Sequence, residues 1–547
     1  MTTQVRNDRR TLAISTLSPL HIGCGDVYEP SGFVIHAGLL HVLEPADLSL
    51  ALSDAEHKRL AALAEQQHEP VGAIQRFFRD SAARFADLSR QQVVVAEALA
   101  REYAEKAGRP TQRDPSGEAT YNSFQLARTA FRPVDGTPYL PGSSLKGSIR
   151  TAWLNHLNAD LPLNSAEKAD KRRASQNLEQ RLLKYAAGKF ENDPFRKLAL
   201  ADAHPAEEST PPPTRVLYAI SKKKRPPRAD ERPSPELKVF LETIPEALPA
   251  AFLGEMRFAP GATILWDALC DACNGFYRPQ LEEELDHPVL SQRLDQQWRQ
   301  MISHLLGEEL GDLIKARQGF LLRVGRHSGA ESVTLGGVRS IKILGARVDG
   351  KQQFDFRANS TEKRYASLTR AGDHGLLPFG WLWVDACDAP HRHLSDAVRQ
   401  RLAAHSRPLR EAHQERLLLL EEKAERRAAA AAVLASRKRT EEAAARAEVE
   451  ARQAHARALA EMSPNRRRVE EFIADFAARA EQLRGNKENA NAVCHNAART
   501  LARDAVAWTH EERMAVADAI EQWLPKVVKV ELKDERKKLK LSALRAP

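Results

Sequence analysis

The sequence predicts an α+β protein whose last third is helical. Short apolar runs typical of strands, such as residues 12–17, recur through the first 390 residues. A strand, a Pro-Gly turn and an amphipathic helix follow one another at residues 139–157, YLPGSSLKGSIRTAWLNHL. Beyond residue 390 the chain is almost free of glycine, and residues 411–460 are rich in Ala, Arg, Glu and Leu, which favour helices. We therefore expect mixed sheets and helices first, then a long helix and a small helical domain.

Length and composition exclude several classes of protein. A chain of 547 residues is too long for one typical core, so we expect two or three domains. Without a run of eighteen apolar residues we expect no membrane span, and the charged N-terminus has no apolar segment behind it to make a secretory signal. Five cysteines suit a reducing cytosol, which predicts a cytoplasmic protein. A net charge of +9 permits binding to a polyanion.

The predicted helix of the central stretch begins with groups suited to an anion. Ser143 or Ser144 is a natural N-cap, and the first turn combines free backbone N–H groups with Lys146 and Arg150 at i and i+4. It is not a nucleotide-binding P-loop, because Lys146 precedes Gly147 instead of following the last glycine. Two interpretations stay open from these residues: a phosphate site, or a capped surface helix with two solvated cations.

Three stretches carry a resemblance to a known family. Residues 141–152, PGSSLKGSIRTA, resemble the signature of the RAMP superfamily of CRISPR-associated proteins. Residues 17–30, LSPLHIGCGDVYEP, and residues 320–335, FLLRVGRHSGAESVTL, are similar to the opening strand and loop and to the late glycine-rich loop of its Csm branch. Their order and rough spacing resemble those of the subunit that caps the crRNA 3′ end in type III-A effectors. The resemblance covers about the first 390 residues.

The resemblance implies a fold and a domain order. Two RAMP-type domains, ferredoxin-like and RRM-like, are expected at residues 1–160 and 239–390, around a helical and basic, proline-rich insertion at 161–238. A long charged Ala-rich helix at 391–462 and a helical domain at 463–547 depart from the shorter family pattern.

The resemblance also implies a function. We expect a noncatalytic subunit that binds CRISPR RNA, caps its 3′ end and contributes to crRNA maturation and antiviral defence by recruiting host nucleases. Its expected partners are crRNA and other Csm subunits, above all the backbone RAMP subunit. No cofactor, metal or membrane contact is expected.

The RNA contacts implied by the resemblance are polar side chains and glycines that let an RNA backbone come close. They are His21, Gly23, Gly25, Gly142, Ser143, Ser144, Lys146, Gly147, Arg150, Arg323, Gly325, Arg326 and Gly329. From the residues alone, a tight turn with a packed histidine is the favoured interpretation of the loop at 21–26, and the resemblance reverses that preference.

The remaining elements follow in chain order. We expect a strand at residues 12–17, a hairpin at 33–35 and 39–43, helices at 47–90 and 91–106, strands at 239–266, a helical run at 281–313, a strand at 320–323 and a closing strand at 376–384. Residues 108–132 predict a loop in which arginines alternate with aromatics, such as Arg128 and Phe131; this suits single-stranded RNA or a solvated loop anchored by buried rings. The basic, proline-rich residues 205–235 predict a flexible insertion.

Two other chemistries are weighed against RNA binding without catalysis. Cys270 and Cys273 form a CxxC, but a zinc site needs two further ligands, so we expect both in a helix-facing core. An endoribonuclease that processes repeat RNA would use His21 or Asp26. Acid–base cleavage needs a second proton-transfer group and a lone carboxylate is not a metal site, so we expect no catalytic residue.

A third hypothesis is a structural assembly subunit in which the helical arm does the essential binding. RNA contact would then be incidental.

Overall fold

The computed structural model describes residues 8–65, 70–113, 119–121, 124–170, 172–207, 210–226, 239–348, 350–387 and 392–547. The chain divides into two compact units, unit 1 (Met1–Glu425) and unit 2 (Arg426–Pro547), and each is described by itself. Most of the N-terminal stretch examined for a signal (residues 1–7) and the end of the expected flexible insertion (227–238) lie outside the described residues.

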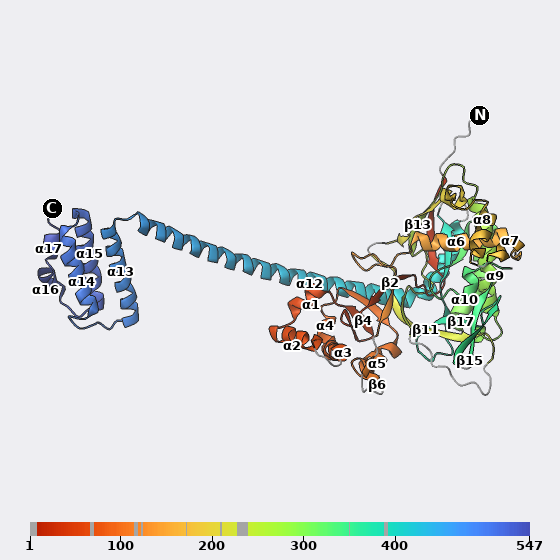
Figure 1. Cartoon of the computed structure of the whole chain (residues 1–547), viewed down its shortest axis with the longest axis horizontal. Coiled ribbons are helices and arrows are strands. Elements are labelled where there is room, and N and C mark those ends of the chain that lie inside the picture. Colours follow the sequence, from red (N-terminus) through yellow and green to blue (C-terminus); the bar gives the residue numbers. More distant parts are fainter. Residues whose placement is uncertain are drawn as a thin grey trace, which may run out of the picture. The chain divides into compact units, whose positions relative to one another are not determined.

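The elements of unit 1 alternate between strands and helices along the chain (Figure 1). The strands are β1 (Asp8–Thr16), β2 (Gly23–Tyr28), β3 (Phe33–His36), β4 (Leu39–Val42), β5 (Gln91–Val95), β6 (Pro110–Arg113), β7 (Ala119–Tyr121), β8 (Leu126–Thr129), β9 (Leu198–Leu200), β10 (His204–Pro205), β11 (Arg215–Lys223), β12 (Phe240–Thr243), β13 (Phe252–Phe258), β14 (Gly319–Arg323), β15 (Ile341–Val348), β16 (Lys351–Arg357), β17 (Glu362–Ser367), β18 (Leu377–Pro378) and β19 (Trp381–Ala386). The α-helices are α1 (Pro45–Ala51), α2 (Asp54–Ala64), α3 (Pro70–Asp80), α4 (Ala82–Ala86), α5 (Glu97–Lys106), α6 (Gly142–Asn158), α7 (Ser165–Ala169), α8 (Ala174–Leu183), α9 (Trp266–Asp286), α10 (Gln296–Gly307) and α11 (Glu309–Lys315), followed by the first part of α12 (Arg392–Glu461). Short 3₁₀ turns are η1 (Phe190–Asn192), η2 (Pro194–Lys197), η3 (Ser291–Arg293) and η4 (Ala330–Val333).

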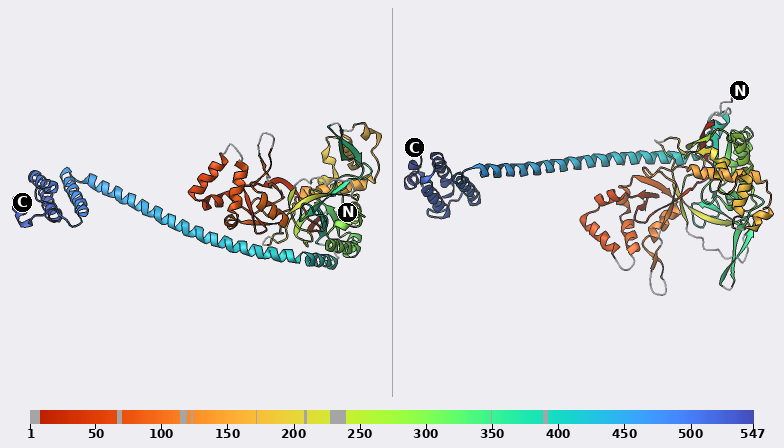
Figure 2. Two further views of the ribbon diagram at one scale, coloured as in Figure 1. Left: turned by 90° about the horizontal axis from the view of Figure 1, so that it is seen from below. Right: turned by 45° about the horizontal axis from the view of Figure 1, so that its top comes forward.

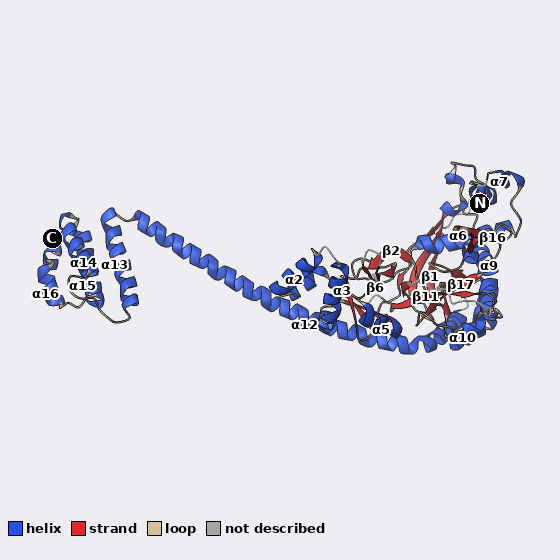
Figure 3. Cartoon of the chain, turned by 60° about the horizontal axis from the view of Figure 1, so that its bottom comes forward, coloured by secondary structure: helices blue, strands red, loops and turns tan. Residues whose placement is uncertain are grey.

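One sheet joins distant parts of the chain. Its order is β10-β13-β1-β19-β14, with β9 beside β13, and β1 pairs antiparallel with both β13 and β19. The second half of β1 is fully buried, which explains its apolar sequence. Helices α6 and α9 pack against each other (Figure 3). Both also pack against β14. The sheet thus combines strands from both RAMP-type domains expected from the sequence. The expected domain limits at residues 160 and 238 therefore do not separate two sheets in the folded chain.

The second sheet has the order β2-β8-β12-β11-β5-β4-β3, and β17 joins it beside β11. Helices α1 to α4 lie together near its β3–β4 end (Figure 2), where Phe77, Phe78 and Phe85 form a small core with Val34 of β3. The hairpin expected at 33–43 is confirmed, with Phe33 opposite Val42.

The prediction of a flexible insertion at residues 205–235 is wrong for residues 215–223, which form strand β11. Strand β11 lies between β12 and β5, and its residues 216–220 are buried. The run VLYAI is apolar enough for a central strand, but the prolines and lysines around it suggested a solvated segment.

Several shorter predictions also need correction. Residues 23–28 and 126–129 form the paired strands β2 and β8 instead of loops, and residues 91–95 form β5 instead of helix. Their partners lie far away in sequence, so local pattern did not reveal them. The helical run at 281–313 breaks after Asp286 at His287-Pro288, because proline disfavours helix at the preceding residue. The strands expected at 12–17, 320–323 and 376–384 are confirmed. Of the range expected as strands at 239–266, β12 and β13 are observed, whereas residues 259–265 form no strand and α9 begins at Trp266.

Helix α12 confirms the long helix and tolerates Pro408 inside it. In unit 1, its Val398 and Leu402 are buried in the main core. Within unit 2, its residues 426–458 are all exposed apart from Arg427. This pattern agrees with the alanine-rich, charge-paired sequence, which offers no strong apolar face.

Unit 2 confirms the helical C-terminal domain. After α12 it contains α13 (Pro464–Leu483), α14 (Val493–Asp504), η5 (Ala505–Ala507), α15 (His510–Val527), α16 (Leu532–Lys538) and α17 (Leu541–Leu544). Ser463 caps α13, with Pro464 at its first position, so the Ser463-Pro464 pair separates α13 from the end of α12. Its core contains Val469, Phe472 and Phe476 at helical spacing. Unit 2 therefore has a hydrophobic core of its own.

Candidate nucleic-acid interface

The structure brings together the three stretches that the sequence singled out. The backbone N–H of Arg326 donates to the carbonyl oxygen of His21 over 2.8 Å. Gly325, at φ +85°, packs so closely on that carbonyl that a Cβ atom would overlap it. On the other side, Ser148 Oγ of α6 donates to the carbonyl oxygen of Arg323 over 3.0 Å. The loop after β14 thus lies between the His21 segment and helix α6.

His21 is not available for the nucleotide contact expected of it. Its side chain is fully buried, and Nδ1 lies 2.7 Å from the carbonyl oxygen of Glu242. Burial lowers the pKa of His21, the bond to Glu242 opposes this, and the charge of Arg326 lowers it further. The alternative interpretation, a packed histidine beside a turn, is the one observed. A buried ring also does not present an acid–base group to an RNA phosphodiester.

Gly23 and Gly25 lie on an open strip of backbone. Both are exposed, on strand β2, and the pairing with β8 is irregular between Gly23 and Val27. Gly25 has φ +92° with no atom near its missing side chain, so the conformation and not crowding requires glycine. On the paired strand β8, the guanidinium carbon of Arg128 lies 4.5 Å from the Tyr28 ring centroid and 3.4 Å from that of Phe131. The arginine–aromatic combination noted in the sequence is therefore a contact within the protein.

Helix α6 starts differently from the prediction. Neither Ser143 nor Ser144 is the N-cap; Pro141 occupies that position without a side-chain cap. The N–H of Gly142 instead donates to Asp202 Oδ1 over 2.7 Å, and the backbone of Leu200 leaves no space for a Cβ atom at Gly142. A carboxylate of the protein therefore already lies where an anion was expected.

Both predicted phosphate-binding cations of α6 have partners within the chain. Lys146 Nζ donates to the carbonyl oxygen of Leu198 over 2.6 Å, and Arg150 forms ion pairs with Glu179 and Asp193. Burial lowers the pKa of Lys146. These contacts attach α6 to β9, α8 and the η1–η2 turn. On the exposed face of α6, Ser143 and Gly147 remain open.

Arg323 is a buried structural cation and not a surface contact. It is 4% exposed, its Nε donates to the carbonyl oxygen of Phe379 over 3.0 Å, and its Nη2 lies 3.2 Å from Glu284 Oε2. Trp381 Nε1 also donates to Glu284 over 3.0 Å. Burial by itself would raise the pKa of Glu284, but the charges of Arg323 and Lys363 outweigh burial and hold it below its usual value.

The loop that follows carries an exposed cation. Arg326 is exposed, Gly329 has φ +88°, and His327 between them has φ +68°. Burial, reinforced by the charges of Arg364 and Arg326, lowers the pKa of His327 to about 3. The side chain of His327 is therefore neutral near pH 7, and the positive charge around it comes from Arg326 and Arg364. We call the exposed residues Gly23, Gly25, Ser143, Gly147 and Arg326 the loop surface.

One candidate feature was missed by sequence reasoning. Strands β15 and β16 form a hairpin whose Phe354 and Phe356 are 53% and 57% exposed, with their ring centroids 5.7 Å apart. Lys342 Nζ lies 4.2 Å from the Phe354 ring centroid. The Asp349-Gly350 pair between two apolar-containing runs is a hairpin signal that could have revealed it. Exposed rings beside a cation suit base stacking.

Groups that could bind a metal lie elsewhere. Cys270 and Cys273 are buried free thiols on α9, and burial raises the pKa of each, so the CxxC packs in the core as expected. Among the described residues, His304, Glu308 and Glu309 come close enough to share an ion, but Arg401 forms ion pairs with both glutamates.

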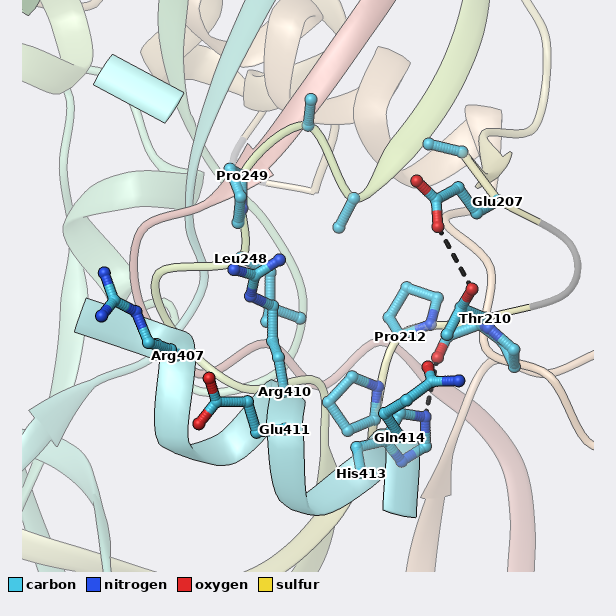
Figure 4. A pocket seen from close by; sticks show the side chains of 15 residues that line it. Glu207, Thr210, Pro212, Leu248, Pro249, Arg407, Arg410, Glu411, His413 and Gln414 are labelled. Carbon is cyan, nitrogen blue, oxygen red and sulfur yellow. Dashed lines mark hydrogen bonds between the residues drawn. The ribbon is translucent and has the colours of Figure 1, made fainter. Parts of the chain in front are cut away.

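A cavity of about 380 Å³ lies where α12 meets the rest of unit 1 (Figure 4). Prolines 211–213 and Pro249 form apolar walls, while Arg407 and Arg410 extend from α12. His413 lies 2.9 Å from the carbonyl oxygen of Pro211 through Nε2, which attaches α12 to this wall. The cavity is thus part of the contact between α12 and the segments 206–213 and 248–251. No helix in the described part of the chain has the length and apolar character needed to cross a membrane.

Comparisons with known proteins found a relative by sequence and solved structures that align with this chain over part of its length. The CRISPR system Cms protein Csm5 of Streptococcus thermophilus is 31% identical over 160 residues, which cover 28% of this chain and 40% of that protein. A chain of the Csm–crRNA–target RNA ternary complex of a type III-A CRISPR-Cas system aligns with a TM-score of 0.42 and 17% identity, over 70% of this chain and 100% of its own. The crystal structure of T. onnurineus Csm5 aligns with a TM-score of 0.38 and 17% identity, over 68% and 99%.

The family assignment rests on a longer match. A model of the RAMP superfamily matches residues 13–304, more than half of the chain. The match contains two of the three convergent stretches, and the third, around Gly325, packs directly on the first. The chain therefore belongs to the RAMP superfamily.

Proposed function

We propose that this chain is a noncatalytic, crRNA-binding subunit of a type III-A Csm complex that holds the crRNA 3′ end and contributes to crRNA maturation. Its partners in this proposal are crRNA, the backbone RAMP subunit and the nucleases that trim the RNA. The observation that supports it best is the convergence of the three RAMP-like stretches, which leaves exposed glycines beside Arg326. An RNA backbone can approach such glycines closely while a guanidinium pairs with phosphate.

The proposal divides all the expected site residues except Ser144 into three groups. The loop surface makes the RNA contacts. Lys146, Arg150, Arg323 and the buried His21 hold the elements that carry that surface, since each has a partner within the chain. Gly142, Gly325 and Gly329 shape the backbone around it.

Replacing Arg326 by Gln should weaken crRNA retention. Because one phosphate contact is lost, the negative slope of log affinity against log salt concentration should become shallower by about 0.7. The measurement is photo-crosslinking of end-labelled crRNA in the assembled complex together with a salt titration. Lys58, an exposed lysine on α2, provides the matched control through Lys58→Gln. The proposal fails if wild-type crosslinks lie away from the RNA 3′ end or if Arg326→Gln behaves like the control.

Replacing Phe354 and Phe356 together by Ser should reduce affinity for single-stranded RNA by at least about tenfold, since base–aromatic stacking is worth about 1–3 kcal/mol per base. Both rings are more than half exposed, so the unfolding midpoint should hardly change. Phe190→Ser, at another exposed ring (57%), is the control in the same binding assay. Equal losses in both variants would exclude stacking on the hairpin.

A structural assembly subunit is the second candidate. The observation that favours it is that Lys146 and Arg150 are both held within the chain. Truncation after Glu425, at the division between the units, separates the candidates while it keeps the core residues Val398 and Leu402. If the truncated chain no longer assembles into the complex, and Arg326→Gln leaves the crRNA crosslinks unchanged, the structural role is favoured. If the truncated chain still assembles, and Arg326→Gln loses the crRNA crosslinks, RNA binding is favoured.

A further inference from the structure

Unit 2 contains a basic hollow of about 600 Å³ between the end of α14 and the α16–α17 turn. Five basic side chains line it: Arg499, Arg503, Arg513, Lys538 and Lys540. No Asp or Glu side chain lines it, in a unit whose residues are all described. Residues 464–547 hold 17 Lys and Arg against 13 Asp and Glu, so this hollow gathers cations while most acidic residues lie elsewhere.

Three of these five basic side chains have partners within unit 2. Arg513 donates to the carbonyl oxygen of Ala546 over 2.8 Å, Lys538 pairs with Glu535, and Arg503 pairs with Asp504.

The side chains of Arg499 and Lys540 form no hydrogen bond or ion pair with any described residue. Lys540 has φ +52°, between α16 and α17. Both charges are therefore available to a ligand carrying carboxylates or phosphates.

The floor of the hollow is aliphatic. Val506 is 66% exposed, and Leu539 and Leu544 form the nearby edge of the unit 2 core, beside Ala502 and Ala543. No aromatic side chain lines the hollow. Single-stranded nucleic acid gains much of its affinity from stacking on aromatic rings, which this floor does not offer. An aliphatic floor with a basic rim instead complements an amphipathic protein helix that carries acidic flanks.

We propose that this hollow docks an acidic amphipathic segment of a protein partner. An aliphatic side chain of that segment sits over Val506, and its carboxylates pair with Arg499 and Lys540. This docking surface lies in the helical extension and does not depend on the RNA-binding role proposed for unit 1.

The full-length chain can be tested with a synthetic helical peptide of about 18 residues, or five turns, with leucines at i, i+3, i+4 and i+7 and glutamates on both flanks. Fluorescence anisotropy should show binding, and hydrogen–deuterium exchange should show protection at residues 499–506 and 538–544. Arg499→Gln combined with Lys540→Gln should weaken binding about tenfold, as loss of two complementary charges at one contact predicts. Lys487→Gln combined with Lys533→Gln removes two exposed charges outside the hollow and should leave affinity unchanged.

Val506→Asp provides a second variant, which should abolish binding without disturbing the fold because this side chain is mostly exposed. Three results would overturn the proposal. They are absence of peptide binding, equal binding of a scrambled peptide of the same composition, and an oligouridine that binds where the peptide does not and loses affinity in the Arg499/Lys540 variant. The last result would assign the hollow to RNA.

Discussion

Replacement of Glu284 by Leu should lower the free energy of unfolding of unit 1 by about 3–5 kcal/mol, since it leaves a buried charge without its partner. Glu284 is fully buried, pairs with Arg323 over 3.2 Å and accepts a hydrogen bond from Trp381. Arg323 is itself 4% exposed and cannot recover this interaction from water. The amides of β14 and β19, which flank the network, report the loss directly in hydrogen-exchange measurements.

The neighbouring Glu283 offers a matched control. It pairs with Lys363, but its side chain is 49% exposed, so Glu283→Gln should change stability by less than about 1 kcal/mol. The double variant Arg323→Met/Glu284→Leu should recover much of the stability, because no unpaired charge remains. Similar losses for Glu283→Gln and Glu284→Leu would show that charge count, and not burial, controls the effect.

The same pair predicts a pH dependence. The pKa of Glu284 is lower in the folded chain than the usual value for glutamate of about 4.3. Its contribution to stability is therefore fully present above the unfolded pKa and is lost as pH falls through the folded pKa. The wild-type chain should lose stability more steeply in acid than the Arg323→Met/Glu284→Leu variant.

Gly325→Ala should destabilise unit 1 by about 3 kcal/mol and weaken crRNA binding with it. The φ of +85° is unfavourable for alanine, and the new Cβ would overlap the carbonyl oxygen of His21. The loop after β14 would then have to move away from the His21 segment. Arg326 would move away from Gly23 and Gly25, and the loop surface would no longer be intact. Denaturant unfolding and the crosslinking assay measure the two effects.

Two other glycines separate backbone strain from overlap. Gly25 has φ +92° with open space around it, so Gly25→Ala should cost only about 1 kcal/mol from strain. Gly147 lies in α6 with nothing near it, and Gly147→Ala should stabilise the chain by up to about 1 kcal/mol. If Gly325→Ala costs no more than Gly25→Ala, contact with His21 does not hold the loop.

The site could be predicted in part. The three stretches around His21, Lys146 and Gly325 were all found by their residues, and the structure joins them. The roles of individual side chains could not be predicted, because Asp202 at the start of α6 and Glu179 beside Arg150 lie on elements distant in sequence. A cation pattern shows that charge is present but not whether the fold has already neutralised it.

The sequence by itself determined the local elements of this protein: the buried strand β1, the turn before α6, the alanine-rich α12 and the stop at Ser463-Pro464. These depend on side-chain period, helix propensity and capping, which act over a few residues. Tertiary structure alone decided that β1 pairs with β13 and β19 and that β11 is a central strand. It also buried Arg323 and left Arg326 exposed. Sheet pairing and charge burial depend on partners that the folded chain brings from far away, so a local pattern contains no record of them.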